Sequence, residues 1–298
     1  MRVFVTGATG FVGTAVVREL LSAGHQVLGL SRSDAGAASL QAAGAEVHRG
    51  SLDDLASLQA GAAEADAVIH TGFNHDFSKY KENCESDRRI IAAFGDELAG
   101  SDRPFLVTSG TGLLQLGRPA AESDLPNVGS SVIPRVATEE AVAAIVERGV
   151  KASLIRLPPS VHGAGDHGFV SMLIAKARET GVSAYVGDGE NRWPAVHQFD
   201  AANVYRLVLE RGALEPCYHA VAEEGVPFRQ IAELIGRRLG VPVISKNHEE
   251  ATAHFGWFAH FAGMDSPASS ATTKEWLDWK PIQPGLLEDL DQDAYFAG

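Results

Sequence analysis

Three glycines whose spacing suits phosphate binding stand near the start of the chain. The segment reads Thr6-Gly7-Ala8-Thr9-Gly10-Phe11-Val12-Gly13 and follows the apolar run Val3-Phe4-Val5 directly. In such a turn Gly7 permits the tight bend, Gly10 lets the backbone approach a phosphate, and Gly13 allows a helix to pack closely on a strand. The amides of that helix's first turn then face the anion. The segment therefore predicts a dinucleotide site with contacts from Gly7, Thr9, Gly10, Phe11, Val12 and Gly13.

The residues that end the second apolar run bear on which dinucleotide binds. A carboxylate at this position hydrogen-bonds the adenosine ribose of NAD, whereas an arginine accommodates the additional phosphate of NADP. The chain has Ser31-Arg32-Ser33 after Leu28-Gly29-Leu30. Arg32 can form a charge-assisted contact with a phosphate, and Ser31 and Ser33 add hydroxyl donors. We expect NADP, with NAD as the alternative because Asp34 lies next to these residues.

Apolar runs and helical patterns alternate through the first half of the chain, as in repeated strand–helix–strand units. This alternation predicts an α/β Rossmann fold, a doubly wound parallel sheet whose ligands bind at the carboxyl ends of the strands. The expected strands are Val3-Val5, Val27-Leu30, Ala45-His48, Ala67-Ile69, Phe105-Val107 and Ser153-Leu157, and the expected helices lie near 12–23, 35–43, 54–61, 82–99 and 136–148.

The pattern becomes less regular after about residue 160. We expect residues 1–160 to form the NADP-binding domain and residues 161–298 to form mainly a smaller C-terminal substrate-binding lobe, with helix 200–211 packing back on the first domain. Further helices are expected at 168–179, 228–239, 272–278 and in the segment 286–290. Trp193, in a polar loop, is a candidate for lining the substrate pocket because a tryptophan there needs some burial.

Composition limits the partners of the chain. Its 298 residues carry a formal net charge of −13, which argues against binding nucleic acid, and no apolar run is long enough to span a membrane. The only cysteines, Cys84 and Cys217, form no paired motif, and the first residues already belong to a strand. We therefore expect a cytoplasmic protein that acts on a small-molecule substrate, with a homodimer as the default assembly.

Several segments, taken together, resemble the short-chain dehydrogenase/reductase superfamily, in its extended and atypical branches related to NAD-dependent epimerases and dehydratases. The resemblance rests on the glycine-rich turn and on five later segments, and it covers nearly the whole chain. These segments are Leu52-Asp53, His70-Thr71-Gly72-Phe73, Thr108-Ser109-Gly110, Arg156-Leu157-Pro158-Pro159-Ser160-Val161-His162-Gly163 and Val196-His197-Gln198-Phe199-Asp200.

The resemblance implies roles for these segments. The loop His70-Thr71-Gly72 and the residues Leu52 and Asp53 contact the cofactor, although the acidic residues after Ser51 could equally mark a helix start capped by Ser51. The segment Pro158-Pro159-Ser160-Val161 lies against the nicotinamide. Ser109, beside Thr111, matches the serine that hydrogen-bonds the substrate carbonyl. Phe73, His162 and His197, with Trp193, are the candidate substrate contacts.

The chain departs from the family at the proton donor, which is a tyrosine followed four residues later by a lysine. None of the five tyrosines has a lysine at that position. Arg135 aligns with the tyrosine and Glu139 with the lysine. Arg135 cannot supply a proton but can stabilise an oxyanion, or it can form an ordinary helix-face ion pair with Glu139 four residues on.

Three interpretations of the chemistry stay open. The chain reduces an acceptor whose product anion is delocalised, such as a quinone or enone, using Ser109, Thr111 and Arg135. Alternatively, another group supplies the proton to a simple carbonyl, or the chain binds NADP without turnover as a redox sensor. A sugar-nucleotide epimerase or dehydratase fits less well, and no metal site is expected. The candidate proton donors are His70, His162, His167, His197 and Tyr80.

Overall fold

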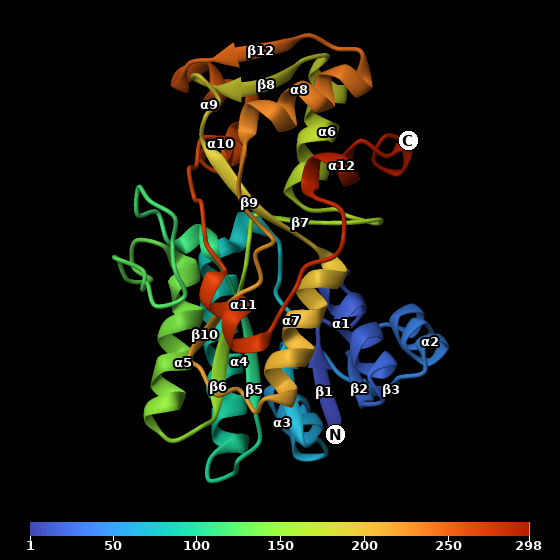
Figure 1. The fold of residues 1–298 in the computed structure, drawn as a ribbon. Coiled ribbons are helices and arrows are strands. Elements are labelled where there is room, and N and C mark those ends of the chain that lie inside the picture. The colour runs from blue at the N-terminus through green and yellow to red at the C-terminus, as the bar shows by residue number, and fades with distance from the viewer. Residues whose placement is uncertain (298) are drawn as a thin grey trace.

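A seven-stranded parallel sheet forms the centre of the computed structural model, which describes residues 1–297 (Figure 1). Its strand order is β10-β6-β5-β4-β1-β2-β3, with β1 between β2 and β4. All neighbouring pairs run parallel. The predicted doubly wound fold is thereby confirmed. The strands are β1 (Arg2–Thr6), β2 (Gln26–Ser31), β3 (Glu46–Arg49), β4 (Ala67–His70), β5 (Phe105–Gly110), β6 (Ala152–Leu157) and β10 (Cys217–His219).

Helices cover both faces of this sheet because successive strand side chains point to opposite faces. Val3 and Val5 of β1 lie in the core shared with α1, α2, α7 and α11, whereas Phe4 lies in the core shared with α3, α4 and α5. Helix α7 packs against α1 in the first of these layers. The helices are α1 (Phe11–Ser22), α2 (Asp34–Ala43), α3 (Leu55–Ala63), α4 (Tyr80–Leu98), α5 (Ala137–Glu147), α7 (Gln198–Glu210) and α11 (Ala271–Leu277).

A second assembly sits above the carboxyl ends of the strands (Figure 1). It contains a three-stranded sheet of order β11-β9-β7 and a parallel pair, β8 with β12. Its helices share one apolar core, which includes Trp193. The elements are β7 (Ser160–His162), β8 (Ser183–Val186), β9 (Arg192–His197), β11 (Glu223–Pro227), β12 (Val243–Lys246), α6 (Phe169–Thr180), α8 (Phe228–Leu239), α9 (His248–Phe255), α10 (Ala259–Ala262) and α12 (Leu286–Leu290).

Short 3-10 turns carry several of the residues discussed below. They lie after β4 and β5, before α5, between α9 and α10, and near the end of the chain. These turns are η1 (Phe77–Lys79), η2 (Thr111–Leu113), η3 (Pro134–Val136), η4 (Gly256–Phe258) and η5 (Asp293–Tyr295).

Candidate functional site

The glycine-rich turn after β1 has the geometry that close approach of a phosphate requires. Gly7 has a φ of 66°, and a Cβ atom on Gly13 would lie 2.0 Å from the carbonyl oxygen of Gly7. Only glycine therefore fits at Gly13 without moving the backbone. Gly10 is exposed, and no side chain caps the N-terminus of α1. The amides of that first turn consequently fit an anionic group such as a dinucleotide pyrophosphate.

The turn after β4 packs directly on the glycine-rich turn. A Cβ on Gly7 would lie 2.7 Å from the amide nitrogen of Gly72, and the Thr71 hydroxyl donates to the carbonyl of Thr6 over 2.8 Å. Leu52 lies against Gly72, because a Cβ on Gly72 would be 3.0 Å from its Cδ2. The fold thus brings three of the predicted cofactor segments together at one edge of the sheet.

The segment after β3 differs from the sequence expectation in one detail. Asp54, rather than Ser51, caps α3 by accepting a hydrogen bond from the amide of Ser57 over 3.0 Å. Ser51 instead accepts a bond from the amide of Asp53 over 3.3 Å, and the Asp53 side chain is exposed. Within residues 1–297 the Asp53 side chain therefore has no hydrogen-bond partner that competes with its predicted contact to the cofactor.

Two arginines stand at the carboxyl ends of β2 and β3. Arg32 is exposed, and Ser33 caps α2 by accepting from the amide of Gly36. Arg49, which sequence reasoning missed, is paired in register with Ser31 on the neighbouring strand. It binds the carboxylate of Asp34 over 2.7 Å and the carbonyl of Ser33 over 2.7 Å. Asp34, the carboxylate that could favour NAD, thus forms an exposed ion pair with a second arginine.

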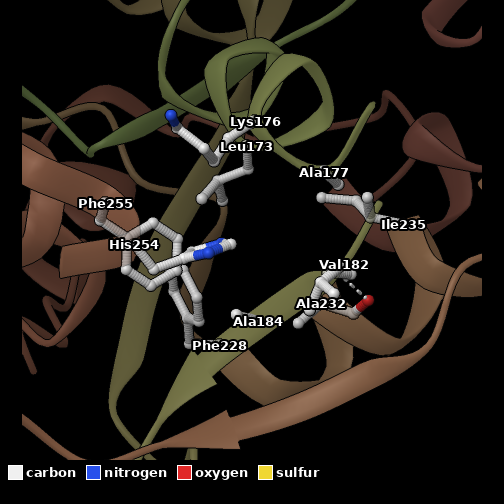
Figure 2. A pocket seen from close by; sticks show the side chains of 11 residues that line it. Leu173, Lys176, Ala177, Val182, Ala184, Phe228, Ala232, Ile235, His254 and Phe255 are labelled. Atoms are coloured by element: carbon white, nitrogen blue, oxygen red, sulfur yellow. Dashed lines mark hydrogen bonds between the residues drawn. The ribbon is translucent and has the colours of Figure 1, made fainter. Parts of the chain in front are cut away.

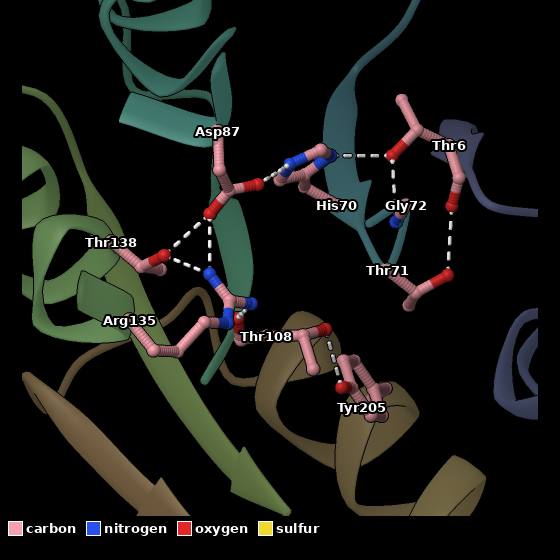
Figure 3. A network of polar contacts seen from close by, with 9 residues as sticks. All are labelled: Thr6, His70, Thr71, Gly72, Asp87, Thr108, Arg135, Thr138 and Tyr205. Carbon is pink, nitrogen blue, oxygen red and sulfur yellow. Dashed lines mark hydrogen bonds and ion pairs between the residues drawn. The ribbon is translucent and has the colours of Figure 1, made fainter. Parts of the chain in front are cut away.

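A buried polar network links β4 to α4 and to the turn before α5 (Figure 3). His70 bonds Thr6 Oγ1 through Nδ1 over 2.6 Å and Asp87 through Nε2 over 2.9 Å, and its side chain is 2% exposed. Arg135 completes the network by donating to Asp87 Oδ2 over 2.6 Å and to the carbonyl of Thr108 over 3.1 Å. Both ring nitrogens of His70 thus have hydrogen-bond partners, so His70 anchors the turn that follows β4.

The charges in this network are balanced. Burial by itself would raise the pKa of Asp87, but the Arg135 guanidinium and the hydrogen bond from His70 outweigh it and hold that pKa well below its usual range. Thr138 also donates to Asp87. The Arg135 guanidinium lies 4.1 Å from the ring centroid of Phe73, in cation–π geometry. Arg135 therefore presents a fixed positive charge beside Phe73, a predicted substrate contact.

Glu139 has a different partner from the one that helix spacing suggests. It forms a bidentate ion pair with Arg156, at 2.8 Å to Nε and 2.7 Å to Nη2, and Arg156 is fully buried. Arg135 and Glu139 therefore do not pair with each other, and the expectation of an i,i+4 ion pair is wrong. Arg156 also donates to Nε2 of His219 over 3.3 Å, and His219 donates from Nδ1 to the carbonyl of Ser269 over 2.8 Å.

Ser109 joins this second network at the end of β5. Its hydroxyl donates to Glu139 Oε1 over 2.7 Å, and its side chain is buried. Thr111, two residues on, is also buried, and its Oγ1 has no hydrogen-bond partner within residues 1–297. Oγ of Ser160 likewise has no hydrogen-bond partner within residues 1–297. Ser160 follows Pro158, which is buried, and Pro159, which is half-buried. These two hydroxyls are therefore free to bond a ligand.

The remaining predicted substrate residues lie in the second assembly. His162 bonds Asp289 of α12 through Nδ1 over 2.9 Å, and Tyr295 donates to the same carboxylate over 2.7 Å. The ring of His197, which caps α7, lies 5.4 Å from that of His162. Trp193 is fully buried and donates to the carbonyl of Phe261 over 3.1 Å. The structure thus places Trp193 in the core, while Phe73 lies next to Arg135.

A small cavity between α6, α8 and β8 lies apart from these groups (Figure 2). Its volume is about 10 Å³, which accommodates no more than one water molecule. Leu173, Phe228 and Phe255 line it together with His254. It is a packing defect of the core rather than a substrate site.

Within residues 1–297 no group of three or more His, Cys, Asp or Glu side chains is arranged to hold a metal ion. None of the helices described over the same residues combines the length and apolar composition needed to cross a membrane.

Comparison with known proteins identifies a family for this arrangement. The sequence profile of the NAD dependent epimerase/dehydratase family matches residues 3–221. An uncharacterized protein of Schizosaccharomyces pombe is 51% identical over 296 residues, covering 99% of this chain and 100% of that protein. An uncharacterized protein of Saccharomyces cerevisiae is 46% identical, with 97% and 98% covered.

More distant similarity extends to an enzyme and to solved structures. A 2-alkyl-3-oxoalkanoate reductase of Stenotrophomonas maltophilia is 28% identical, over 85% of this chain and 80% of that protein. Among solved structures, the dTDP-glucose 4,6-dehydratase DesIV of Streptomyces venezuelae, with NAD bound, superposes with a TM-score of 0.80 at 17% identity. The match covers 99% of this chain and 97% of that one, and it shows a shared fold.

Proposed function

Because the chain belongs to the NAD dependent epimerase/dehydratase family, we propose that it is an NADP(H)-dependent reductase of a carbonyl, quinone or conjugated acceptor. When bound, the cofactor supplies a hydride from the nicotinamide. The glycine-rich turn, with Thr71 and Gly72, would bind its pyrophosphate, and Arg32 its additional phosphate. The similarity to the 2-alkyl-3-oxoalkanoate reductase of Stenotrophomonas maltophilia supports this reaction class.

One observation carries the proposal. The two positions that align with the family's tyrosine and lysine hold Arg135 and Glu139, and each is committed to a separate ion pair, with Asp87 and Arg156. The glycine-rich turn and Ser109 nevertheless match the pattern of the family that the sequence resembles. This combination favours a reduction that needs no tyrosine acid, and it argues against reversible proton transfer at a sugar hydroxyl.

The electron balance of the proposed reaction is simple. The acceptor carbon gains the hydride, the π pair of its C=O bond moves to oxygen, and that oxygen takes a proton from water or a neighbouring donor. Arg135 would lower the energy of the developing oxyanion by its fixed charge. Ser109 would orient the oxygen, with its hydroxyl turning from Glu139 toward the ligand. A conjugated acceptor needs the least stabilisation of its product anion, because the negative charge of that anion is delocalised.

The test is NADPH consumption by the purified protein with simple aldehydes and ketones, quinones, enones and sugar nucleotides. We expect turnover with carbonyl or conjugated acceptors and none with sugar nucleotides. Ser109→Ala should lower kcat/KM by about 10²-fold, in the range for a lost oxyanion contact. The matched control is Ser22→Ala, whose hydroxyl bonds only the carbonyl of Arg18. Tight NADPH binding without turnover of any acceptor would instead support the redox-sensor alternative.

A further inference from the structure

An aromatic contact joins the loop after β4 to the helices of the second assembly. The ring of Phe77, in η1, stacks on the indole of Trp257, in η4, with centroids 4.6 Å apart and planes inclined by 21°. Phe77 also lies 6.3 Å from Phe169 and 6.4 Å from Phe261. We call Phe77 and Trp257 the aromatic clamp. It joins the loop after β4 to the second assembly.

The Trp257 half of the clamp is fixed. Its neighbours Phe255 and Phe258 are buried in the core of the second assembly. Gly256 has a φ of 59°, a conformation that favours glycine and that turns the chain sharply between α9 and η4. Trp257 itself remains 55% exposed. The exposed part of the indole is therefore accessible to a flat ligand, which can stack on it.

Aromatic contacts attach the Phe77 half of the clamp to the second assembly. The hydrogen bonds of its loop are local. The side chain of Asp76 accepts from the backbone amide of Ser78 over 3.1 Å, and the backbone carbonyl of Asp76 accepts from the side-chain amide of Asn83 over 2.9 Å. The aromatic contacts therefore supply the link between this loop and the second assembly. Stacked pairs contribute only a modest free energy, so a competing ring can replace the contact.

A continuous row of aromatic contacts leads from the clamp to Arg135. Phe77 lies 5.6 Å from Tyr80, Tyr80 lies 6.5 Å from Phe73, and Phe73 faces the guanidinium at 4.1 Å. His75 lies 5.3 Å from Phe73. This row of rings therefore ends at the guanidinium of Arg135, a cation.

We propose that the aromatic clamp binds the planar, conjugated part of the acceptor between Phe77 and Trp257, with the acceptor's oxygen directed toward Arg135. This assignment rests on the proposed reductase function and specifies its substrate class. A ring enters once the loop carrying Phe77 moves away by about the thickness of one ring, 3.5 Å. A flat π system can stack on both halves of the clamp, whereas a puckered aliphatic ring can stack on neither.

Tryptophan fluorescence tests the assignment without turnover. The protein is saturated with NADP⁺, which cannot donate a hydride, and titrated with naphthoquinone, alone or together with decalone, its saturated bicyclic counterpart. Of the four tryptophans, Trp193 and Trp279 are buried and Trp276 is partly buried, so Trp257 is the accessible reporter. We expect naphthoquinone to quench the emission at saturable concentrations. Decalone, which lacks a conjugated chromophore and does not itself quench, is added in excess as a competitor, and we expect it not to displace naphthoquinone.

Three variants make the result specific. Trp257→Leu should abolish the saturable quenching, whereas the matched control Trp276→Phe should retain it with unchanged affinity. Phe77→Leu keeps the reporter and should weaken naphthoquinone binding by about three- to tenfold, the loss expected for one stacked ring. Each variant is first checked for wild-type NADPH affinity, which separates a local effect from misfolding.

The outcomes distinguish the clamp from the reductase function. Equal binding of decalone and naphthoquinone, or wild-type quenching in Trp257→Leu, would overturn the clamp even if the protein reduces carbonyl compounds. Saturable quenching that depends on Phe77 and Trp257, without any turnover when NADPH replaces NADP⁺, would support the clamp and contradict the reductase function.

Discussion

The hydroxyl of Ser109 donates a hydrogen bond to Glu139 over 2.7 Å, and Glu139 is held in turn by two nitrogens of the fully buried Arg156. Arg156 thus balances the charge of Glu139, and Asp87 balances the charge of Arg135. The proposal that these two residues stand in place of the family's lysine and tyrosine therefore concerns side chains that each belong to an ion pair, so both have a structural role as well as a proposed chemical one.

The Glu139–Arg156 pair predicts a large stability loss when one partner is removed. Glu139→Ala leaves the guanidinium of Arg156 buried and uncompensated, which typically costs about 3–5 kcal/mol. The double variant Glu139→Leu/Arg156→Met removes both charges and should recover most of that loss. Urea unfolding at neutral pH measures both free energies. A loss below about 1 kcal/mol in Glu139→Ala would show that the pair does not exist in solution.

Asp87 predicts a specific dependence of stability on pH. Its pKa in the folded protein is lower than in the unfolded chain, so its contribution is fully present above the unfolded value of 3.8 and is lost as the pH falls below it. Asp87→Asn should therefore lower the unfolding free energy at pH 7 by about 3 kcal/mol and remove part of the destabilisation on acidification.

Asp96 supplies the matched control for this variant. It lies on the same helix, α4, and forms an exposed ion pair with Arg148 at 2.6 Å. Exposed pairs contribute little, so Asp96→Asn should change stability by less than about 1 kcal/mol. Equal effects of the two substitutions would contradict the buried network around Asp87.

Replacing Gly13 by alanine, the smallest possible substitution, should weaken cofactor binding. A Cβ at this position would overlap the Gly7 carbonyl oxygen at 2.0 Å, so Gly13→Ala must displace the glycine-rich turn. We expect NADPH affinity, measured by titration calorimetry, to fall at least about tenfold, equivalent to 1.4 kcal/mol. Thr14→Ala, at the next and exposed position of α1, should bind normally. Normal binding by Gly13→Ala would place the cofactor elsewhere.

Replacing Arg32 should change the preference between NADPH and NADH rather than weaken the binding of both cofactors. Because Arg32 is exposed beside the end of β2, Arg32→Ala should weaken NADPH binding by about 10–100-fold through the lost charge-assisted contact, which is worth about 1.5–3 kcal/mol. NADH affinity of the same variant serves as the internal control and should stay unchanged. A parallel loss for both cofactors would argue against a phosphate contact at Arg32.

Replacing Asp166 should stabilise the folded protein. Burial raises the pKa of Asp166 to about 6, so the folded protein binds a proton more tightly than the unfolded chain, and stability falls as the pH rises from about 4 to 6. Asp166→Asn keeps an acceptor for the amide of Gly168, now bonded over 2.6 Å, and removes the buried charge. We expect a gain of about 1–2 kcal/mol at pH 8 that vanishes near pH 4, measured by urea unfolding. A gain independent of pH would contradict this explanation.

The first half of the fold could be read from the sequence because its strands and helices are long enough to show a period. The expected helix near 12–23 is α1, and six of the seven strands of the large sheet were expected. Strand β10 was missed because three residues show no period. The elements β7, β8, β9, β11 and β12 were missed because all three of their pairings join distant segments, and β7, β8 and β12 are also short.

The polar networks were harder to predict because they depend on side chains from separate elements. Arg135 and Glu139 have ideal helical spacing for an ion pair, yet Arg135 lies in the 3-10 turn η3 and Glu139 in α5, and they bond different partners. A sequence signal for their true partners does exist. Asp87 falls on the apolar stripe of α4 with Ile91 and Phe94, and Arg156 interrupts a buried strand. A charged residue in such a position generally has a buried counterion.

The central claim is hydride transfer to an acceptor by a site that lacks the tyrosine acid. The most direct measurement supplies NADPH deuterated at the transferred position of the nicotinamide, together with a conjugated aldehyde, and analyses the product by mass spectrometry. We predict one deuterium on the former carbonyl carbon, formed at least about 10²-fold more slowly by Ser109→Ala. An alcohol without deuterium, or bound NADPH that reduces no acceptor, would contradict the account.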